Sequence, residues 1–107
     1  MGPETYHTVA RVGEVVEGIG RPFEVGGRAL AVFLDEGTYY AIDDDCPHKG
    51  LPLYDGIVFD RSVTCLAHGW RFDLAGGRWL DNPQVRVGMY PVRVVGDEIQ
   101  VAVDETG

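Results

Sequence analysis

Two short segments of the sequence each combine one cysteine with one histidine. Cys46 and His48 are separated by one residue and Cys65 and His68 by two, with the 16 residues 49–64 between the two pairs. Thiolate sulfur and imidazole nitrogen are common metal ligands in proteins, and pairs of them at this spacing are typical of metal sites. The sequence therefore predicts that these four side chains hold one metal centre.

The residues around each pair favour turns that bring its two donors together. Pro47 disfavours a helical conformation at Cys46, and in an extended chain residues two apart point to the same side. The second pair needs a turn, which Gly69 can assist because glycine has no Cβ. Each pair can therefore present its sulfur and its nitrogen to one point.

The pattern Cys-x-His, about 16 residues, then Cys-x-x-His resembles that of the Rieske iron–sulfur proteins. This chain carries it as CPHKG and CLAHGWRFD, and the likeness extends through GLPLYDG and WRFDLAGGRW and weakly into the flanking strands. The resemblance implies a [2Fe–2S] cluster whose inner iron is bound by the two cysteines and whose outer iron is bound by the two histidines. The cofactor ligands implied are Cys46, His48, Cys65 and His68.

Turn residues and apolar patterns predict an all-β fold. Fifteen glycines and six prolines favour many turns, and no segment sustains a helical period of apolar residues. Two hairpins are expected, around Gly26-Gly27 and Gly96-Asp97. Strands are expected at residues 6–10, 22–25, 28–34, 38–42, 62–65, 70–72, 78–80, 89–95 and 98–103, with a loop at 81–83. The resemblance implies one Rieske domain over residues 1–107, with an antiparallel β sandwich or barrel base and a cluster-binding subdomain over about 43–83.

Three consecutive aspartates, Asp43 to Asp45, directly precede the first pair of predicted ligands. Their carboxylates could tune the cluster or mark a docking surface. The interpretation that the sequence favours is a solvated turn, because aspartate is common in turns and loops.

Length and charge restrict the class of protein. A chain of 107 residues is long enough for one domain, and a net charge of −8 argues against binding to duplex nucleic acid or to an anionic membrane. No apolar run approaches the roughly 20 residues of a membrane helix. The N-terminal residues lack the pattern of a signal peptide. We therefore expect a cytoplasmic monomer without a membrane or nucleic-acid partner.

The predicted function is electron transfer rather than catalysis. Terminal oxygenases that carry a similar Rieske segment also need a mononuclear iron site, and His7 is the one histidine left to build it. No GxGxxG motif opens a helix after a strand, so a nucleotide-binding fingerprint is missing. The resemblance implies a one-electron ferredoxin that connects a flavin-dependent reductase to a terminal oxygenase or another redox enzyme.

Two departures from Rieske proteins of membrane complexes, at three positions, predict a low reduction potential. Those proteins usually have a disulfide between the ligand loops, where this chain has Leu51 and Ala67, and often a serine where it has Trp70. Fewer hydrogen bonds to the cluster sulfurs stabilise the reduced state less. We expect a midpoint in the lower part of the class range of about −150 to +300 mV.

Several alternatives remain open from the sequence. The small subunit of an assimilatory nitrite reductase also resembles a Rieske domain. The same four donors could form a structural Cys₂His₂ zinc module. Cys65 and His68 could form a nucleophilic pair, or the two cysteines could form a disulfide.

Overall fold

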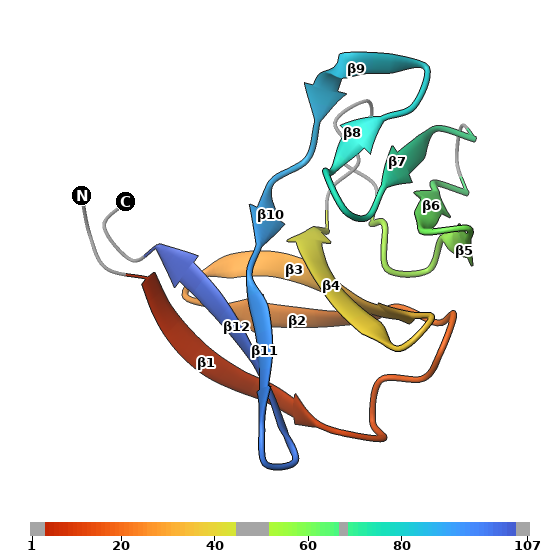
Figure 1. The fold of residues 1–107 in the computed structure, drawn as a ribbon. Helices are drawn as coiled ribbons and strands as arrows, with labels where there is room; N and C mark the ends of the chain where they lie inside the picture. The colour runs from red at the N-terminus through yellow and green to blue at the C-terminus, as the bar shows by residue number, and fades with distance from the viewer. Residues whose placement is uncertain (1–3, 45–51, 67–68, 105–107) are drawn as a thin grey trace.

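The computed structural model describes residues 4–44, 52–66 and 69–104, which fold into antiparallel β-strands joined by turns (Figure 1). Among these residues no helix is long and apolar enough to cross a membrane. The strands are β1 (Glu4–Arg11), β2 (Arg21–Val25), β3 (Arg28–Asp35), β4 (Thr38–Asp43), β5 (Ile57–Phe59), β6 (Ser62–Thr64), β7 (Arg71–Asp73), β8 (Arg78–Trp79), β9 (Asn82–Arg86), β10 (Met89–Tyr90), β11 (Val92–Val95) and β12 (Glu98–Asp104).

The strands of the described residues form three sheets. Their orders are β1-β12-β11, β10-β4-β3-β2 and β5-β6-β7-β8-β9. The first two sheets make a base, and the third lies at one end of it beyond β10 (Figure 1). The prediction of an all-β, antiparallel fold is confirmed.

Strand β3 lies between two hydrophobic cores because its sequence is apolar on both faces. Successive side chains of a strand point to opposite sides. Leu30 and Val32 therefore pack in the core of the base, whereas Ala31 and Phe33 pack in a second core under the third sheet. All four side chains are fully buried. The continuous run ALAVFL, rather than an alternating one, is typical of a strand covered on both faces.

The second core, which we call the site core, joins the base to the third sheet. Its buried members are Ala31, Phe33, Ile42, Leu53, Val63, Cys65, Phe72, Leu74 and Val87. They come from β3, from β4, from the strands of the third sheet and from the segments that connect them. The candidate ligand Cys65 is therefore part of the packing that attaches the third sheet to the base.

Three strand predictions were incomplete. Residues 89–95, predicted as one strand, form two strands in different sheets on either side of Pro91, which has no N–H to donate to a ladder. The segment 82–86 is strand β9, although its first residues were predicted to be a loop. Strand β5 was not predicted, because its three residues are too short for a periodic signal.

Candidate metal centre

Cys65 is the candidate ligand that lies within the described part of the chain. Cys46, His48 and His68 lie outside the described residues, so their predicted roles stay predictions. Accordingly, the described ranges contain no group of three or more histidine, cysteine or acidic side chains that could hold a metal ion. The groups that can be placed are the Cys65 side chain and the hydrogen-bonding groups that close the two ligand loops.

The second ligand loop is closed by two backbone hydrogen bonds at Cys65. The Cys65 N–H donates to the carbonyl oxygen of Trp70 at 2.7 Å, and the Gly69 N–H donates to the carbonyl oxygen of Cys65 at 2.9 Å. Gly69 has a φ of 73°, a conformation that glycine adopts most readily, so the predicted turn at this residue is present. Cys65 itself is a free thiol with 1% exposure.

The first ligand loop is closed by the side chain of Asp44. Its Oδ1 atom accepts hydrogen bonds from the backbone N–H groups of Leu53, at 2.9 Å, and Tyr54, at 2.8 Å. The backbone of Asp44 also accepts a longer bond from the Leu53 N–H, at 3.3 Å. With 8% exposure, Asp44 is buried rather than part of a solvated turn. The favoured interpretation of this residue was therefore wrong, because its carboxylate bonds with the far end of the loop.

The neighbouring Asp43 was also expected in a solvated turn, but it is the last residue of β4 and binds the segment before β10. Its N–H donates to the carbonyl oxygen of Gly88 at 2.9 Å, and its Oδ2 accepts from the Gly88 N–H at 2.8 Å. Its Oδ1 accepts from the Tyr90 hydroxyl at 2.5 Å. A Cβ on Gly88 would lie 2.6 Å from the Asp43 carboxylate, so this contact requires glycine. Asp45 lies outside the described residues.

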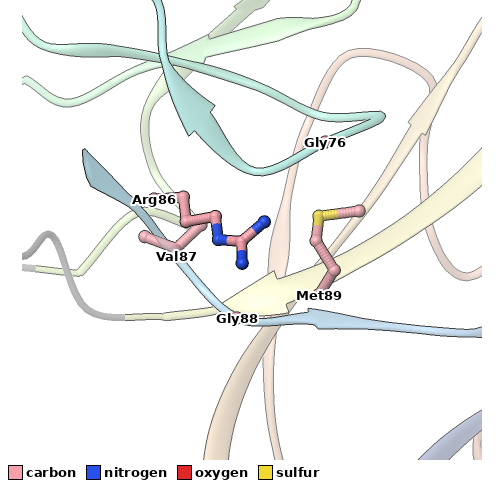
Figure 2. A pocket seen from close by; sticks show the side chains of 5 residues that line it. All are labelled: Gly76, Arg86, Val87, Gly88 and Met89. Carbon is pink, nitrogen blue, oxygen red and sulfur yellow. The ribbon is translucent and has the colours of Figure 1, made fainter. Parts of the chain in front are cut away.

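A cavity of about 280 Å³ lies beside this contact (Figure 2). Gly76 borders it on the turn between β7 and β8. On the other side it is bordered by the run from the end of β9 to the start of β10, which is Arg86, Val87, Gly88 and Met89. In Figure 2 the Arg86 guanidinium extends towards the Met89 side chain. Of the predicted site residues, Cys65 can be placed, and it does not line this cavity.

The two ligand loops converge on the site core. Leu53 lies at the end of the first ligand loop and Cys65 at the start of the second. Both are fully buried in the site core. Residues 5–104 match a family model described as a Rieske [2Fe-2S] domain. The chain belongs to the Rieske [2Fe–2S] family.

Relatives of this Rieske protein include electron carriers of oxygenase systems. The ferredoxin component of the naphthalene 1,2-dioxygenase system of Pseudomonas aeruginosa is 34% identical over 89 residues, which cover 82% of this chain and 86% of the relative. A solved complex of reduced oxygenase and oxidized ferredoxin in carbazole 1,9a-dioxygenase has a chain that matches with a TM-score of 0.80 and 28% identity, covering 89% of this chain and 99% of that chain.

A second solved structure that matches this chain has a different name. A protein of Mycobacterium tuberculosis named as an NADH-dependent nitrite reductase small subunit matches with a TM-score of 0.90 and 29% identity, covering 94% of this chain and 96% of that chain. The match to the family model supports the predicted [2Fe–2S] cofactor, and both solved structures match the fold of the described residues. The predicted class, a one-electron carrier rather than an enzyme, agrees with relatives that are named ferredoxin components.

Cys65, the one proposed ligand within the described residues, fits a role in holding a [2Fe–2S] cluster. Cys65 offers a sulfur donor that forms no disulfide, and the backbone bonds at Trp70 and Gly69 fix the course of the chain on both sides of the loop that contains His68. A buried thiolate is stable when a metal binds it, since coordination offsets the cost of burying its charge. When bound, the cluster accepts and releases one electron.

The hydrogen bond to Asp43 and partial burial raise the pKa of Tyr90 to about 12, with burial as the larger cause. Both disfavour the phenolate, because it would lose hydration and its hydroxyl hydrogen bond beside a carboxylate. An unfolded tyrosine ionises near pH 10. The folded state is therefore expected to lose stability relative to the unfolded state as the pH rises from about 10 towards 12.

A Tyr90→Phe variant tests this linkage. We expect it to lack one tyrosine that ionises near pH 12, and to lose less stability than the wild type between about pH 10 and pH 12. The measurement is a spectrophotometric titration of tyrosinate absorbance in both proteins. Subtracting the titration of the variant from that of the wild type isolates the ionisation of Tyr90. If that difference is centred near pH 10, the Asp43 contact does not hold the hydroxyl in its neutral form.

Proposed function

We propose that this Rieske protein is a ferredoxin that takes single electrons from a flavin-dependent reductase and passes them to a terminal oxygenase. The observation that carries the proposal is its likeness, over 86% of the relative, to the ferredoxin component of a naphthalene 1,2-dioxygenase system. The match to the ferredoxin-sized chain of an oxygenase–ferredoxin complex supports the same kind of partner.

We propose that Cys46 and Cys65 bind the inner iron and that His48 and His68 bind the outer iron. The burial of Cys65 in the site core supports an inner position for the iron that it binds. The next residue, Leu66, is 59% exposed, so the chain turns from the core to the surface within one residue. An exposed end of this loop would suit electron exchange with a docked protein.

The charge of the chain supports a partner with a basic docking face. A net charge of −8 attracts a positively charged surface and raises the association rate at low ionic strength. We propose that the ferredoxin acts as a cytoplasmic monomer, which forms short-lived complexes with its reductase and its oxygenase in turn.

Electron transfer can be tested with purified components. The ferredoxin is mixed with NADH and the flavin reductase of a naphthalene-type dioxygenase system, and bleaching of its visible absorption is followed. We expect rapid bleaching that slows as salt is added, and recovery of the colour when the matching terminal oxygenase and its substrate are supplied in air. An oxidised spectrum that persists with several such reductases would contradict the proposal.

The similarity to the Mycobacterium tuberculosis protein supports a second candidate, the small subunit of a nitrite reductase. This candidate predicts stable association with a large sirohaem subunit rather than short-lived complexes. Size-exclusion chromatography of the ferredoxin with such a subunit distinguishes the two. A complex that stays together at low micromolar concentration would favour the nitrite reductase, and separate elution would favour the ferredoxin of an oxygenase system.

A further inference from the structure

We propose that Asp44 is a positioning residue of the cluster: it closes the first ligand loop and lowers the reduction potential. The closure brings the start of the loop, at Asp44, against its end, at Leu53 and Tyr54. The inference rests on the proposed ligation by Cys46 and His48, which lie between these ends in the sequence. It does not depend on the proposed reductase or oxygenase.

Both sides of this closure are fixed to ordered structure. The Asp44 N–H donates to the carbonyl oxygen of Ala29 in β3 at 3.0 Å, which extends the base sheet as far as the loop. On the other side, the Leu53 side chain is fully buried in the site core, and the Leu53 carbonyl accepts from the Gly56 N–H at 3.0 Å. Movement of the loop ends would therefore disturb the base sheet or the site core.

The carboxylate suits this position because one oxygen satisfies two backbone donors in a buried place. Buried N–H groups that lose their acceptor destabilise a protein, and bonds to a charged acceptor are stronger than bonds between neutral groups. Alanine at position 44 would remove the side-chain oxygen that accepts from the backbone N–H groups of Leu53 and Tyr54. Asparagine would keep an oxygen acceptor and remove the negative charge.

The charge has a second consequence, because Asp44 precedes the proposed ligand Cys46 by only two residues. A buried carboxylate two residues from a proposed ligand disfavours the added electron, and its charge is screened less than an exposed charge. Neutralising it should favour the reduced state by about fivefold. For a one-electron couple this is about 40 mV, at about 59 mV per tenfold change.

Two variants of the full-length, cluster-containing protein separate closure from charge. For Asp44→Ala we expect loss of most of the iron and sulfide on purification, and faster hydrogen exchange at the Leu53 and Tyr54 amides. For Asp44→Asn we expect full iron and sulfide, wild-type exchange at both amides and an unchanged reduced EPR spectrum, but a midpoint about 40 mV higher by protein-film voltammetry. The control is Asp55→Asn, which removes an exposed carboxylate next to Tyr54.

The results can overturn each half of the proposal. If Asp44→Ala retains the cluster with unchanged amide exchange, the side chain does not close the loop. If Asp44→Asn shifts the midpoint no more than Asp55→Asn does, the buried charge does not set the potential. All these measurements use the isolated protein, so they remain informative if it fails to exchange electrons with an oxygenase system.

Discussion

Replacing Cys65 with alanine is expected to yield a colourless protein without iron, sulfide or a reduced EPR signal. The variant loses one of two proposed cysteine ligands of the inner iron, and with 1% exposure at this position a thiol from solution cannot easily replace it. The affinity for the cluster should fall by more than the roughly 10- to 100-fold that a metal site loses when a residue bonded to one of its ligands is removed. Iron and sulfide analysis of the purified variant, with its visible spectrum, measures the effect.

Val63→Ala is the matched control for this prediction. Val63 lies two residues earlier, is fully buried in the same site core and offers no ligand atom. Its truncation should cost about 2 kcal/mol in the free energy of unfolding and leave the cluster content unchanged. A Cys65→Ala protein that binds two irons and two sulfides as the wild type does would refute the assignment of Cys65 as a ligand.

Gly56→Ala is expected to destabilise the fold strongly and to lower the cluster content. A Cβ at Gly56 would collide with the carbonyl oxygen of Thr64, and it would lie 2.7 Å from Cγ2 of Val63. Relief requires strand β6 to move, and β6 leads directly into Cys65. We expect a loss of about 3 kcal/mol in the free energy of unfolding, together with reduced cluster content. Thermal denaturation and iron analysis measure these two effects.

Gly37→Ala separates this collision from the ordinary cost of replacing glycine. Gly37, in the turn between β3 and β4, has a φ of 80°, and a Cβ there would meet no atom within 4 Å. The substitution should therefore cost about 1 kcal/mol, from backbone strain alone, and leave the cluster in place. Equal losses in the two variants would show that β6 adjusts to the added methyl group.

Much of the strand pattern was predictable because it depends on local chemistry. Glycine-rich turns at Gly26-Gly27 and Gly96-Asp97 end one strand and start the next, and both hairpins are present. The predicted turn at Gly69 is present for the same reason, since a positive φ there suits glycine. Strands β5 and β9 escaped prediction, because short strands are stabilised by their partners in a sheet rather than by a pattern of their own.

The assignment of the four ligands stays a prediction, which rests on the types and spacing of the donors and on the resemblance to the Rieske proteins. The pattern of Cys46, His48, Cys65 and His68 indicated the cofactor before any fold was known, and the family comparison confirms that cofactor. The structure adds the burial of Cys65 and the closure of its loop by Trp70 and Gly69.

What the tertiary structure alone decided is the role of the aspartates. In the sequence Asp43, Asp44 and Asp45 are three identical side chains before a loop, and nothing local distinguishes them. The alternation of β4 and its partners sends the carboxylate of Asp43 to Gly88 and Tyr90, and the end of the strand places that of Asp44 against Leu53 and Tyr54. These partners are distant in sequence, so they become neighbours only when β-strands pair and the site core packs. The sequence by itself predicted which side chains bind the cluster, and long-range packing decided that Asp44, unlike Asp43, bonds with the far end of the first ligand loop.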